Sequence, residues 1–254
     1  MKTLIGTLLC LFLTTPLLAA PLRIVSEEWP PYIFAKDGEI KGSDKEVADI
    51  LLKQLGYQVS WELMPWRRAL HTVQTGAADA VLDISPDAKR LEHFIFPDEP
   101  FSTNVTVLFY VSSRPFPFER LEDLRGLTIG VSPGYHYNNE EFMTADYFTR
   151  EPAPTFESNL LKLVHGRIDM VVISRPAGIH TSKRLGIDDQ VSYHSTPLSK
   201  GDYFLAFRRA PEFERLGEEF GQALRDFKQT DEYASIQHKY GLGLDGQIIP
   251  AAAH

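Results

Sequence analysis

The sequence has little cysteine, no excess of basic charge and, after its first 20 residues, no long apolar run. Its one cysteine, Cys10, cannot build a disulfide framework or a cysteine zinc site. The sequence has 34 Asp and Glu but only 26 Lys and Arg, so its net charge is -8. This charge argues against nucleic acid or an anionic membrane as the main partner. The 8 histidines form no H-E-x-x-H pair, and no phosphate-binding Gly-Lys loop exists. We expect an acidic globular protein without metal or other cofactor.

The first 20 residues, MKTLIGTLLCLFLTTPLLAA, have the layout of a secretory signal peptide: Lys2, a leucine-rich run, then small residues. The run is shorter than the roughly 20 residues that a membrane-spanning helix needs, and Pro16 interrupts its end. We expect cleavage near Ala19 or Ala20 and export, in a bacterium to the periplasm.

Strand and helix patterns alternate along the rest of the chain, which predicts an α/β fold. The spacing of apolar residues predicts strands over residues 22–25, 57–63, 78–82, 127–131 and 169–173. It predicts helices over residues 43–55, 65–75 and 138–148, and a long helical stretch from Pro211 to about Tyr240.

Two segments, HTVQTGAADAVL and LKLVHGRIDMVV, share the order helix, glycine, two residues, aspartate and buried strand. The glycine suits a left-handed helix cap, and the short link returns the chain to a parallel sheet. Either the two segments are copies of one structural unit or their similarity arose by chance, and the pattern alone favours chance. Two stretches, SSRPFPFERLEDLRG and HSTPLSKGDYFLAF, are candidate crossovers between two lobes, with a binding cleft between them.

Five segments along the chain carry a family resemblance: WPPYIF, DGEIKGSDKEVADILLKQLG, TGAADAVLDISPDAKRLEHFIFPDEPF, LEDLRGLTIGVSPG and HGRIDMVV. In this order they resemble the periplasmic solute-binding proteins of family 3, the receptors of polar amino acid ABC transporters. The resemblance implies a monomer with a two-lobed α/β fold of the type II, Venus-flytrap kind, two crossovers and a permease partner in the inner membrane. Lobe 1 would comprise residues 21–109 plus 201–254, and lobe 2 residues 110–200.

The resemblance implies that Arg90, with Phe96 six residues on, grips the carboxylate of a small polar solute. A guanidinium suits this role because it offers planar, bidentate hydrogen bonds. Residue type alone favours a surface arginine paired with Glu92 or Asp87, and the loop of residues 84–89 is about two residues longer than in the family.

The resemblance also implies further pocket residues in lobe 1. Trp29, with Tyr32 close by, stands where the family has a ring that covers the ligand, and Trp66 matches a position that lines the pocket. Packing beside neighbouring prolines, or on a buried helix face, is the alternative for these rings. Glu27, Asp83 and Ser85 complete the expected set in lobe 1.

In lobe 2, Gly134, Tyr135 and His136 follow a strand and precede a predicted helix, a turn that could cradle an anion. The family has a small hydroxyl residue where Tyr135 stands, so this ring fills part of the pocket or presents a phenol. His136 is either a ligand contact or a surface histidine.

Ser174 occupies the position of the family's amine-binding aspartate. Burying an unpaired ammonium costs several kcal/mol. Either Asp83 or Glu27 supplies the missing charge, or the ligand is a small carboxylate without that amine.

The leading hypothesis is the substrate-binding component of an ABC transporter, which captures an amino acid or related small carboxylate by closure and catalyses nothing. The alternatives are a periplasmic enzyme on the same fold, such as a cyclohexadienyl dehydratase, and a ligand-sensing receptor. Residues 130–134 fit the G-x-S-x-G pattern of hydrolases, but Pro133 lacks the N–H that would bind the oxyanion.

Overall fold

The computed structural model describes residues 20–244, so the predicted signal peptide lies outside the described residues, apart from its last position. The strands are β1 (Leu22–Ser26), β2 (Phe34–Lys36), β3 (Glu39–Lys41), β4 (Val59–Leu63), β5 (Ala80–Ile84), β6 (Phe94–Ile95), β7 (Ser102–Val111), β8 (Thr128–Val131), β9 (Thr149–Pro152), β10 (Met170–Ser174), β11 (Val191–Tyr193) and β12 (Ser199–Arg208). The helices are α1 (Ser43–Gln54), α2 (Trp66–Gln74), α3 (Ala88–His93), α4 (Glu140–Thr144), α5 (Phe156–Val164), α6 (Arg175–Leu185), α7 (Pro211–Phe227) and α8 (Asp231–Lys239), with a short 3-10 helix η1 (Leu121–Leu124).

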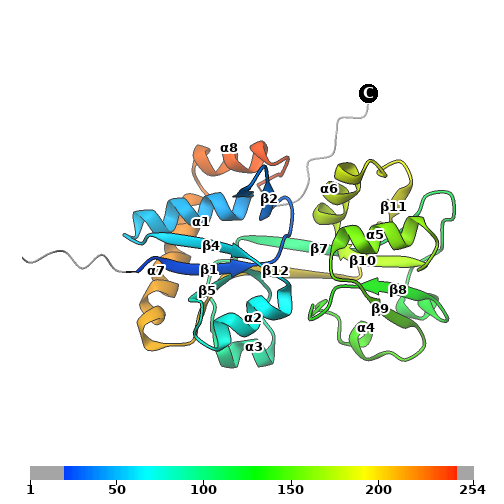
Figure 1. Ribbon diagram of the computed structural model, residues 1–254, viewed down its shortest axis with the longest axis horizontal. Helices are drawn as coiled ribbons and strands as arrows, with labels where there is room; N and C mark the ends of the chain where they lie inside the picture. The colour runs from blue at the N-terminus through cyan, green and yellow to red at the C-terminus, as the bar shows by residue number, and fades with distance from the viewer. Residues whose placement is uncertain (1–19, 245–254) are drawn as a thin grey trace, which may run out of the picture.

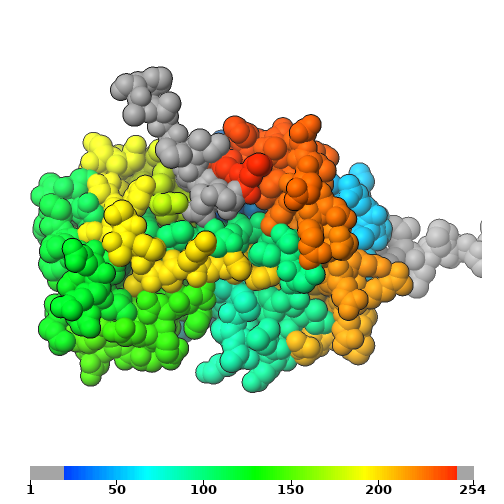
Figure 2. Space-filling model, turned by 180° about the vertical axis from the view of Figure 1, so that it is seen from behind, coloured from blue at the N-terminus to red at the C-terminus, as the bar shows by residue number. Residues whose placement is uncertain are grey.

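These elements form two lobes, which confirms the predicted α/β fold. Lobe 1 contains β1, β4 and β5 with α1, α2, α3, α7 and α8, and lobe 2 contains β8 to β11 with α4 to α6 (Figure 1). One sheet runs through both lobes in the order β4-β1-β5-β12-β7-β10-β8-β9. Seen from behind, a notch separates the lobes below the band that joins them (Figure 2).

The two lobes are joined by β7 and β12, neighbouring antiparallel strands of 10 residues each. Strand β7 pairs with β12 up to Thr106 and with β10 of lobe 2 from that residue on. Strand β12 pairs with β7 up to Tyr203 and with β5 of lobe 1 from Phe204 on. The lobe limits predicted at residues 109/110 and 200/201 fall inside these strands and stay a prediction.

One crossover prediction is confirmed and the other is wrong. The segment HSTPLSKGDYFLAF contains most of β12, which does connect the lobes. The segment SSRPFPFERLEDLRG begins only after β7 has already entered lobe 2, and it carries the 3-10 helix η1 on the way to β8. Its prolines and charges mark an ordinary loop there.

Two helix predictions need correction. The helix expected over residues 138–148 is only α4, because Asn138 has a left-handed φ of 49° and Asn139 caps the helix by accepting a hydrogen bond from the N–H of Phe142. The long stretch from Pro211 is two helices. The second begins where the hydroxyl of Thr230 accepts a hydrogen bond from the N–H of Tyr233.

Burial follows the pattern expected for helices that cover both faces of parallel strands. Every residue of β5 and β10 is buried, and α7 buries an apolar stripe against the sheet. No helix within residues 20–244 is long and apolar enough to span a bilayer.

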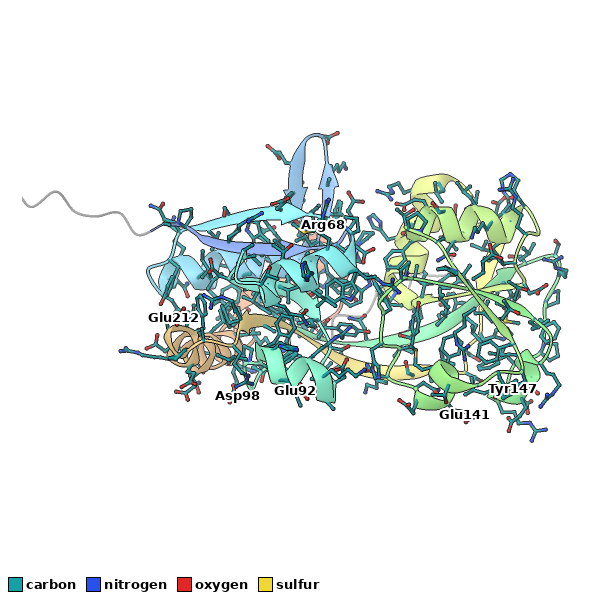
Figure 3. All side chains as sticks on the ribbon, turned by 60° about the horizontal axis from the view of Figure 1, so that its bottom comes forward. Arg68, Glu92, Asp98, Glu141, Tyr147 and Glu212 are labelled. Carbon is teal, nitrogen blue, oxygen red and sulfur yellow. The ribbon has the colours of Figure 1, made fainter. Side chains whose placement is uncertain are left out.

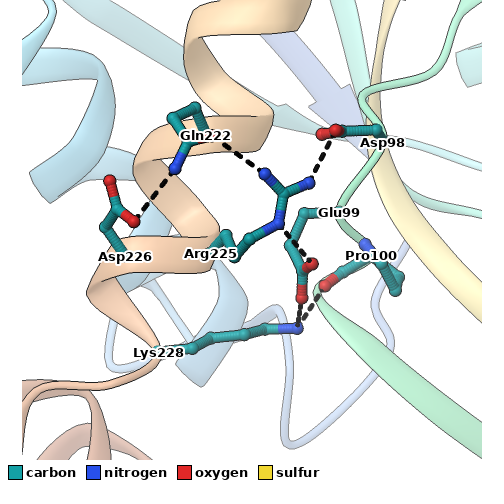
Figure 4. Close-up of polar contacts among 7 residues, drawn as sticks. All are labelled: Asp98, Glu99, Pro100, Gln222, Arg225, Asp226 and Lys228. Carbon is teal, nitrogen blue, oxygen red and sulfur yellow. Dashed lines mark hydrogen bonds and ion pairs between the residues drawn. The ribbon is translucent and has the colours of Figure 1, made fainter.

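Helix α7 also holds the loop that leads into β7, as Figure 4 shows. Arg225 lies 2.6 Å from Asp98, and Lys228 lies 2.6 Å from Glu99 and 2.5 Å from the carbonyl oxygen of Pro100. These ion pairs are partly exposed, so each stabilises only modestly. Together they fix where the first connecting strand leaves lobe 1.

The two similar segments of the sequence have the same structure. Gly76 and Gly166 both have a left-handed φ, of 79° and 68°, and end α2 and α5. The Asp79 carboxylate accepts a hydrogen bond of 2.8 Å from the N–H of Arg23 near the start of β1, and Asp169 accepts one of 2.8 Å from Thr128 at the start of β8. In each lobe, therefore, an aspartate just before one strand binds the backbone at the start of the neighbouring parallel strand.

We predict that Asp79→Ala and Asp169→Ala each lower the free energy of unfolding by about 1.5–3 kcal/mol, because each leaves a strand amide without its charged acceptor. Asparagine at either position keeps one oxygen acceptor and should cost less. Urea unfolding measures both, with the exposed Asp188→Ala as control, expected within about 0.5 kcal/mol of the wild type. Equal stability of the alanine variants and the control would contradict this role.

Candidate functional site

A small cavity of about 30 Å³ lies between the lobes, where the carboxyl ends of their parallel strands face one another. Open α/β sheets bind ligands at this end of their strands. The cavity is lined by Ser26, Glu27, Trp29, Trp66, Asp83, Ser85, Arg90, Tyr135, His136 and Tyr203.

Arg90 is held by the start of its own helix. Asp87 caps α3 by accepting from the N–H of Arg90, 2.8 Å away, and its other oxygen lies 3.2 Å from Nε of the same residue. The guanidinium Nη1 donates to the carbonyl and hydroxyl oxygens of Ser85, at 2.7 and 3.0 Å. Nη2 faces lobe 2, 3.5 Å from the carbonyl oxygen of Gly134. The guanidinium is thus fixed in direction, with one nitrogen turned towards the opposite lobe.

Asp83 reaches the cavity because β5 is irregular at this point. Between Val81 and Ile84 the register with β12 shifts, and Asp83 has a left-handed φ of 64°, a conformation that aspartate tolerates better than most residues. The residue is 7% exposed, and no N–H or hydroxyl group of the described residues donates to its carboxylate oxygens. Its carboxyl group can instead share a hydrogen bond with that of Asp44 when one of the two acids is protonated. Burial, and then the neighbouring Asp44, raise the pKa of Asp83 well above its ordinary value.

Glu27 follows β1 and meets Tyr135 of lobe 2, whose hydroxyl donates a hydrogen bond to the carboxyl group. Burial raises the pKa of Glu27 from 4.5 to about 8, against the lowering effect of that hydrogen bond. Its Oε2 is buried and has no partner among residues 20–244. At neutral pH this carboxyl is therefore mostly protonated.

Aromatic rings form the walls. The ring centroid of Trp29 lies 4.5 Å from that of Tyr203, and Trp66 and Tyr135 meet edge-to-face at 6.0 Å across the lobes. The guanidinium carbon of Arg90 lies 5.7 Å from the Trp66 ring centroid, within cation–π distance. The site thus offers flat, apolar faces around a few charged or ionisable groups.

Polar contacts also join the lobes beside the cavity. Trp29 Nε1 donates to the hydroxyl of Ser174, 3.0 Å away at the end of β10. Arg184 on α6 lies 3.9 Å from Glu28 of lobe 1 and pairs with Glu157 of its own lobe. Ligand-dependent movement of the lobes would have to break or remake these contacts.

A wider groove of about 250 Å³ adjoins the cavity, and Glu27 lines both spaces. Residues of both lobes line it: Glu27, Glu28, Pro30, Leu63, Met64, Pro65, Pro154, Thr155, Phe156 and Glu157. A solute larger than the small cavity has room to extend in this direction.

Most of the predicted site residues lie together. Eight of them line the cavity: Glu27, Trp29, Trp66, Asp83, Ser85, Arg90, Tyr135 and His136. Gly134 adjoins it through its contact with Arg90. His136 Nδ1 also lies 3.2 Å from the side-chain oxygen of Asn138.

Two predicted residues lie behind the cavity wall. Tyr32 is 0% exposed, packs under Trp29 and donates its hydroxyl to Asn104 at 2.6 Å, and Ser174 contacts the Trp29 indole. Arg68 is exposed on α2 (Figure 3).

The anion cradle expected at the turn of residues 134–136 lacks its helix. Helix α4 starts only at Glu140, and the N–H of Ser132 is taken by the hydroxyl of Tyr137 at 2.6 Å. The helix dipole therefore does not act at this turn.

Sequence reasoning missed Ser26 and Tyr203, which also line the cavity. Ser26 ends a strand just before Glu27, a signal that was available in the sequence. Tyr203 comes from a connecting strand far along the chain, and only strand pairing brings it here. Within residues 20–244, no three or more His, Cys, Asp or Glu side chains are grouped to hold a metal ion.

Comparison with known proteins gives consistent matches. The profile of the bacterial extracellular solute-binding proteins, family 3, matches residues 22–243. The arginine-binding extracellular protein ArtP of Bacillus subtilis (strain 168) is 23% identical over 224 residues, covering 86% of this chain and 84% of that protein. The L-cystine-binding protein TcyJ of Escherichia coli (strain K12) is 24% identical over 191 residues, covering 72% and 69%.

Two crystal structures show the same fold. A mutant of ArgBP from T. maritima has a TM-score of 0.77 at 23% identity, with 86% of this chain and 94% of that chain covered. A histidine kinase sensor domain with similarity to periplasmic binding proteins has a TM-score of 0.76 at 22% identity, with 87% and 95% covered.

We predict that Glu27→Gln changes how stability depends on pH. Unfolded glutamate releases its proton near 4.5 and folded Glu27 near 8, so between these values the folded state binds more protons. The stability that this group contributes is present below pH 4.5 and is lost as pH rises to 8, by up to about 1.4 kcal/mol per pH unit.

Urea unfolding at pH 5, 6, 7 and 8 tests this prediction, with Glu92→Gln, an exposed glutamate of α3, as the control. The Glu27→Gln variant should gain stability relative to the wild type as pH rises, whereas the control should follow the wild type. Parallel pH profiles for all three proteins would show that Glu27 ionises normally.

Proposed function

This chain belongs to the bacterial extracellular solute-binding proteins, family 3, and we propose that it captures an amino acid or related small carboxylate between its lobes for an ABC transporter. The observation that carries this proposal is Arg90, a guanidinium that lines the interlobe cavity and is 7% exposed. ArtP and TcyJ, which are named for binding arginine and cystine, support the choice of solute class.

Arg90 binds the carboxylate of the solute in this proposal. Asp87 and Ser85 hold Nε and Nη1, so the guanidinium need not be ordered when the ligand arrives. A carboxylate placed at Nη2 would replace the long contact to the carbonyl oxygen of Gly134 with a charge-assisted hydrogen bond. The turn of Gly134, Tyr135 and His136 then covers it from lobe 2.

Closure follows from contact with both lobes. A ligand that touches lobe 1 at Arg90 and lobe 2 at Tyr135 binds the closed arrangement more tightly than the open one, so it shifts the population towards closure. Bending along β7 and β12, which continue from one lobe into the other, would provide the movement. This function needs no covalent chemistry.

We also propose a location and a partner for this protein. The relatives are extracellular or periplasmic binding proteins, and the leucine-rich N-terminus is consistent with export. We place the mature protein in the periplasm as a monomer, with a permease of the inner membrane as the partner that recognises the closed lobes. Trp29, Trp66 and Tyr203 would cover the apolar part of a small anionic or zwitterionic solute.

A second candidate is an enzyme on the same fold, such as a dehydratase. One observation favours it: the carboxyl group of Glu27 lines the cavity, where burial raises its pKa to about 8, so that it can hold a proton for a general acid step. Turnover of the bound solute during a binding assay would support catalysis, and recovery of unchanged solute would support transport.

We predict that a screen of amino acids and small organic acids finds a solute that stabilises the protein by about 2.7 kcal/mol at 100 times its dissociation constant. Arg90→Ala should weaken that binding by about 10- to 100-fold, because it removes charge-assisted hydrogen bonds to the carboxylate. Thermal shift and calorimetry measure both. Arg68→Ala on the exposed face of α2 is the control and should bind normally. Equal binding by the wild type and Arg90→Ala would refute the carboxylate role.

A further inference from the structure

The cavity between the lobes is too small for the solute that the proposed function requires. Its volume is about 30 Å³, and one water molecule needs about 10–15 Å³ of such space, so the cavity has room for about two waters. Even glycine, the smallest amino acid, is larger than that. In the arrangement that the structure shows, part of the protein therefore occupies the space in which a solute would bind.

The ring of Tyr135 occupies that space from lobe 2. Its phenol donates a hydrogen bond to Glu27 of lobe 1, and the ring meets Trp66 of lobe 1 edge-to-face, with 6.0 Å between the ring centroids. Within its own lobe the ring centroid lies 5.9 Å from that of Tyr137 and 6.1 Å from that of Phe156. Side chains of both lobes thus enclose this ring.

The backbone beside Tyr135 also lies directly on lobe 1. A Cβ atom added to Gly134 would lie only 2.8 Å from Cγ of Arg67 and 3.5 Å from Cδ1 of Trp66. The carbonyl oxygen of Gly134 lies 3.5 Å from Nη2 of Arg90, the nitrogen that would bind a carboxylate in the proposed function. These contacts join one lobe to the other through protein atoms alone, so the closed arrangement needs no solute to bridge it.

Tyr135 is also the ring of the cavity that is free to leave it. Trp29 and Trp66 belong to lobe 1 and are only 5% and 7% exposed, and Tyr203 is part of the connecting strand β12. Tyr135 instead lies between β8 and α4, outside any helix or strand. The groove of about 250 Å³ beside the cavity is lined by Phe156, which packs against Tyr135, so a displaced ring has space next to its present place.

We propose that Tyr135 is a resident occupant of the binding cavity: the lobes close on its ring, and a solute binds only by displacing this ring from Glu27 and Trp66. This inference rests on the proposed function and makes Tyr135 the residue that sets how fast, and therefore how tightly, a solute is captured. The turn of Tyr135 then closes over the solute instead of over its own side chain.

This displacement lowers the affinity for any solute. Molecules that are closed on Tyr135 cannot bind, so the apparent affinity falls with the fraction of molecules that are open. The hydrogen bond from the phenol to Glu27 favours the closed molecules by about two- to tenfold, which is the typical net effect of one such bond. Because these molecules must open before a solute enters, the penalty falls on the association rate and leaves the dissociation rate unchanged.

The first test measures the distance between the lobes without any solute. Spin labels on the substitutions Glu92→Cys in α3 and Glu141→Cys in α4 report this distance, because both residues are exposed and lie on opposite lobes (Figure 3). Cys10, the one native cysteine, lies in the predicted signal peptide. We expect short distances to dominate when Tyr135 is present. Tyr135→Phe should increase the long-distance population by at least about twofold, and Tyr135→Ser should increase it further.

The second test measures binding kinetics by stopped-flow mixing with each of the 20 protein amino acids. Tyr135→Phe keeps the ring and removes only the hydrogen bond to Glu27, so it should associate about two- to tenfold faster than the wild type and dissociate at the same rate. Tyr135→Ser should gain at least as much. If Tyr135 only supported the fold, these variants would lose stability without associating faster.

Tyr193→Phe is the matched control for both tests. Tyr193 is another tyrosine of lobe 2, on β11, where it is 38% exposed and does not line the cavity. Removal of its hydroxyl should leave the distance between the lobes and both rate constants as they are in the wild type.

Unchanged distances in both Tyr135 variants would overturn the inference, as would slower association or weaker binding by Tyr135→Phe. If that binding still depends on Arg90, the proposed function survives without the inference. Binding that is indifferent to Arg90→Ala, or no binding of any amino acid by the wild type or the Tyr135 variants, would overturn the proposed function and, with it, displacement of the ring by a solute.

Discussion

The backbone hydrogen bonds between β7 and β12 are the interaction on which the rest of the molecule depends. These strands pair with each other in the middle and with different lobes at their ends, so they join two half-sheets into one. The pairing brings Tyr203 beside the cavity and sets the carboxyl ends of β1 and β5 opposite that of β8. Charge pairs between α7 and the loop before β7 then fix one end of the connection (Figure 4).

The site divides its chemistry unequally between the lobes. Lobe 1 contributes the guanidinium of Arg90 and the carboxyl groups of Glu27 and Asp83, each set by the end of a strand or the start of a helix. Lobe 2 contributes a phenol and an imidazole from one turn, with a serine hydroxyl behind Trp29. In the proposed function, a solute would therefore make most of its polar contacts with lobe 1.

The sequence was sufficient for features that depend on local pattern. Strand and helix order and the aspartate after Gly76 and Gly166 follow from spacing, whereas the place of Arg90 at the cleft was implied by the family resemblance. The sequence was insufficient for features that depend on pairing between strands far apart along the chain. The strand β7 looks like any other apolar strand, and its change of partner at Thr106 has no local signature. Two further features could not be predicted, because they depend on the elements packed around them. One is the irregular backbone that turns Asp83 inward, and the other is the pair of asparagines that shortens α4.

The paired aspartates, Asp79 and Asp169, bind backbone near the amino ends of β1 and β8, while the cavity lies beyond the opposite ends of these strands. The framework and the recognition surface are thus physically separate. Substitutions around the cleft leave these two ties between strands in place. ArtP and TcyJ, each about a quarter identical to this chain, are named for binding different solutes. In evolutionary terms, the residues that face a solute can change while the residues that hold the sheet together stay the same.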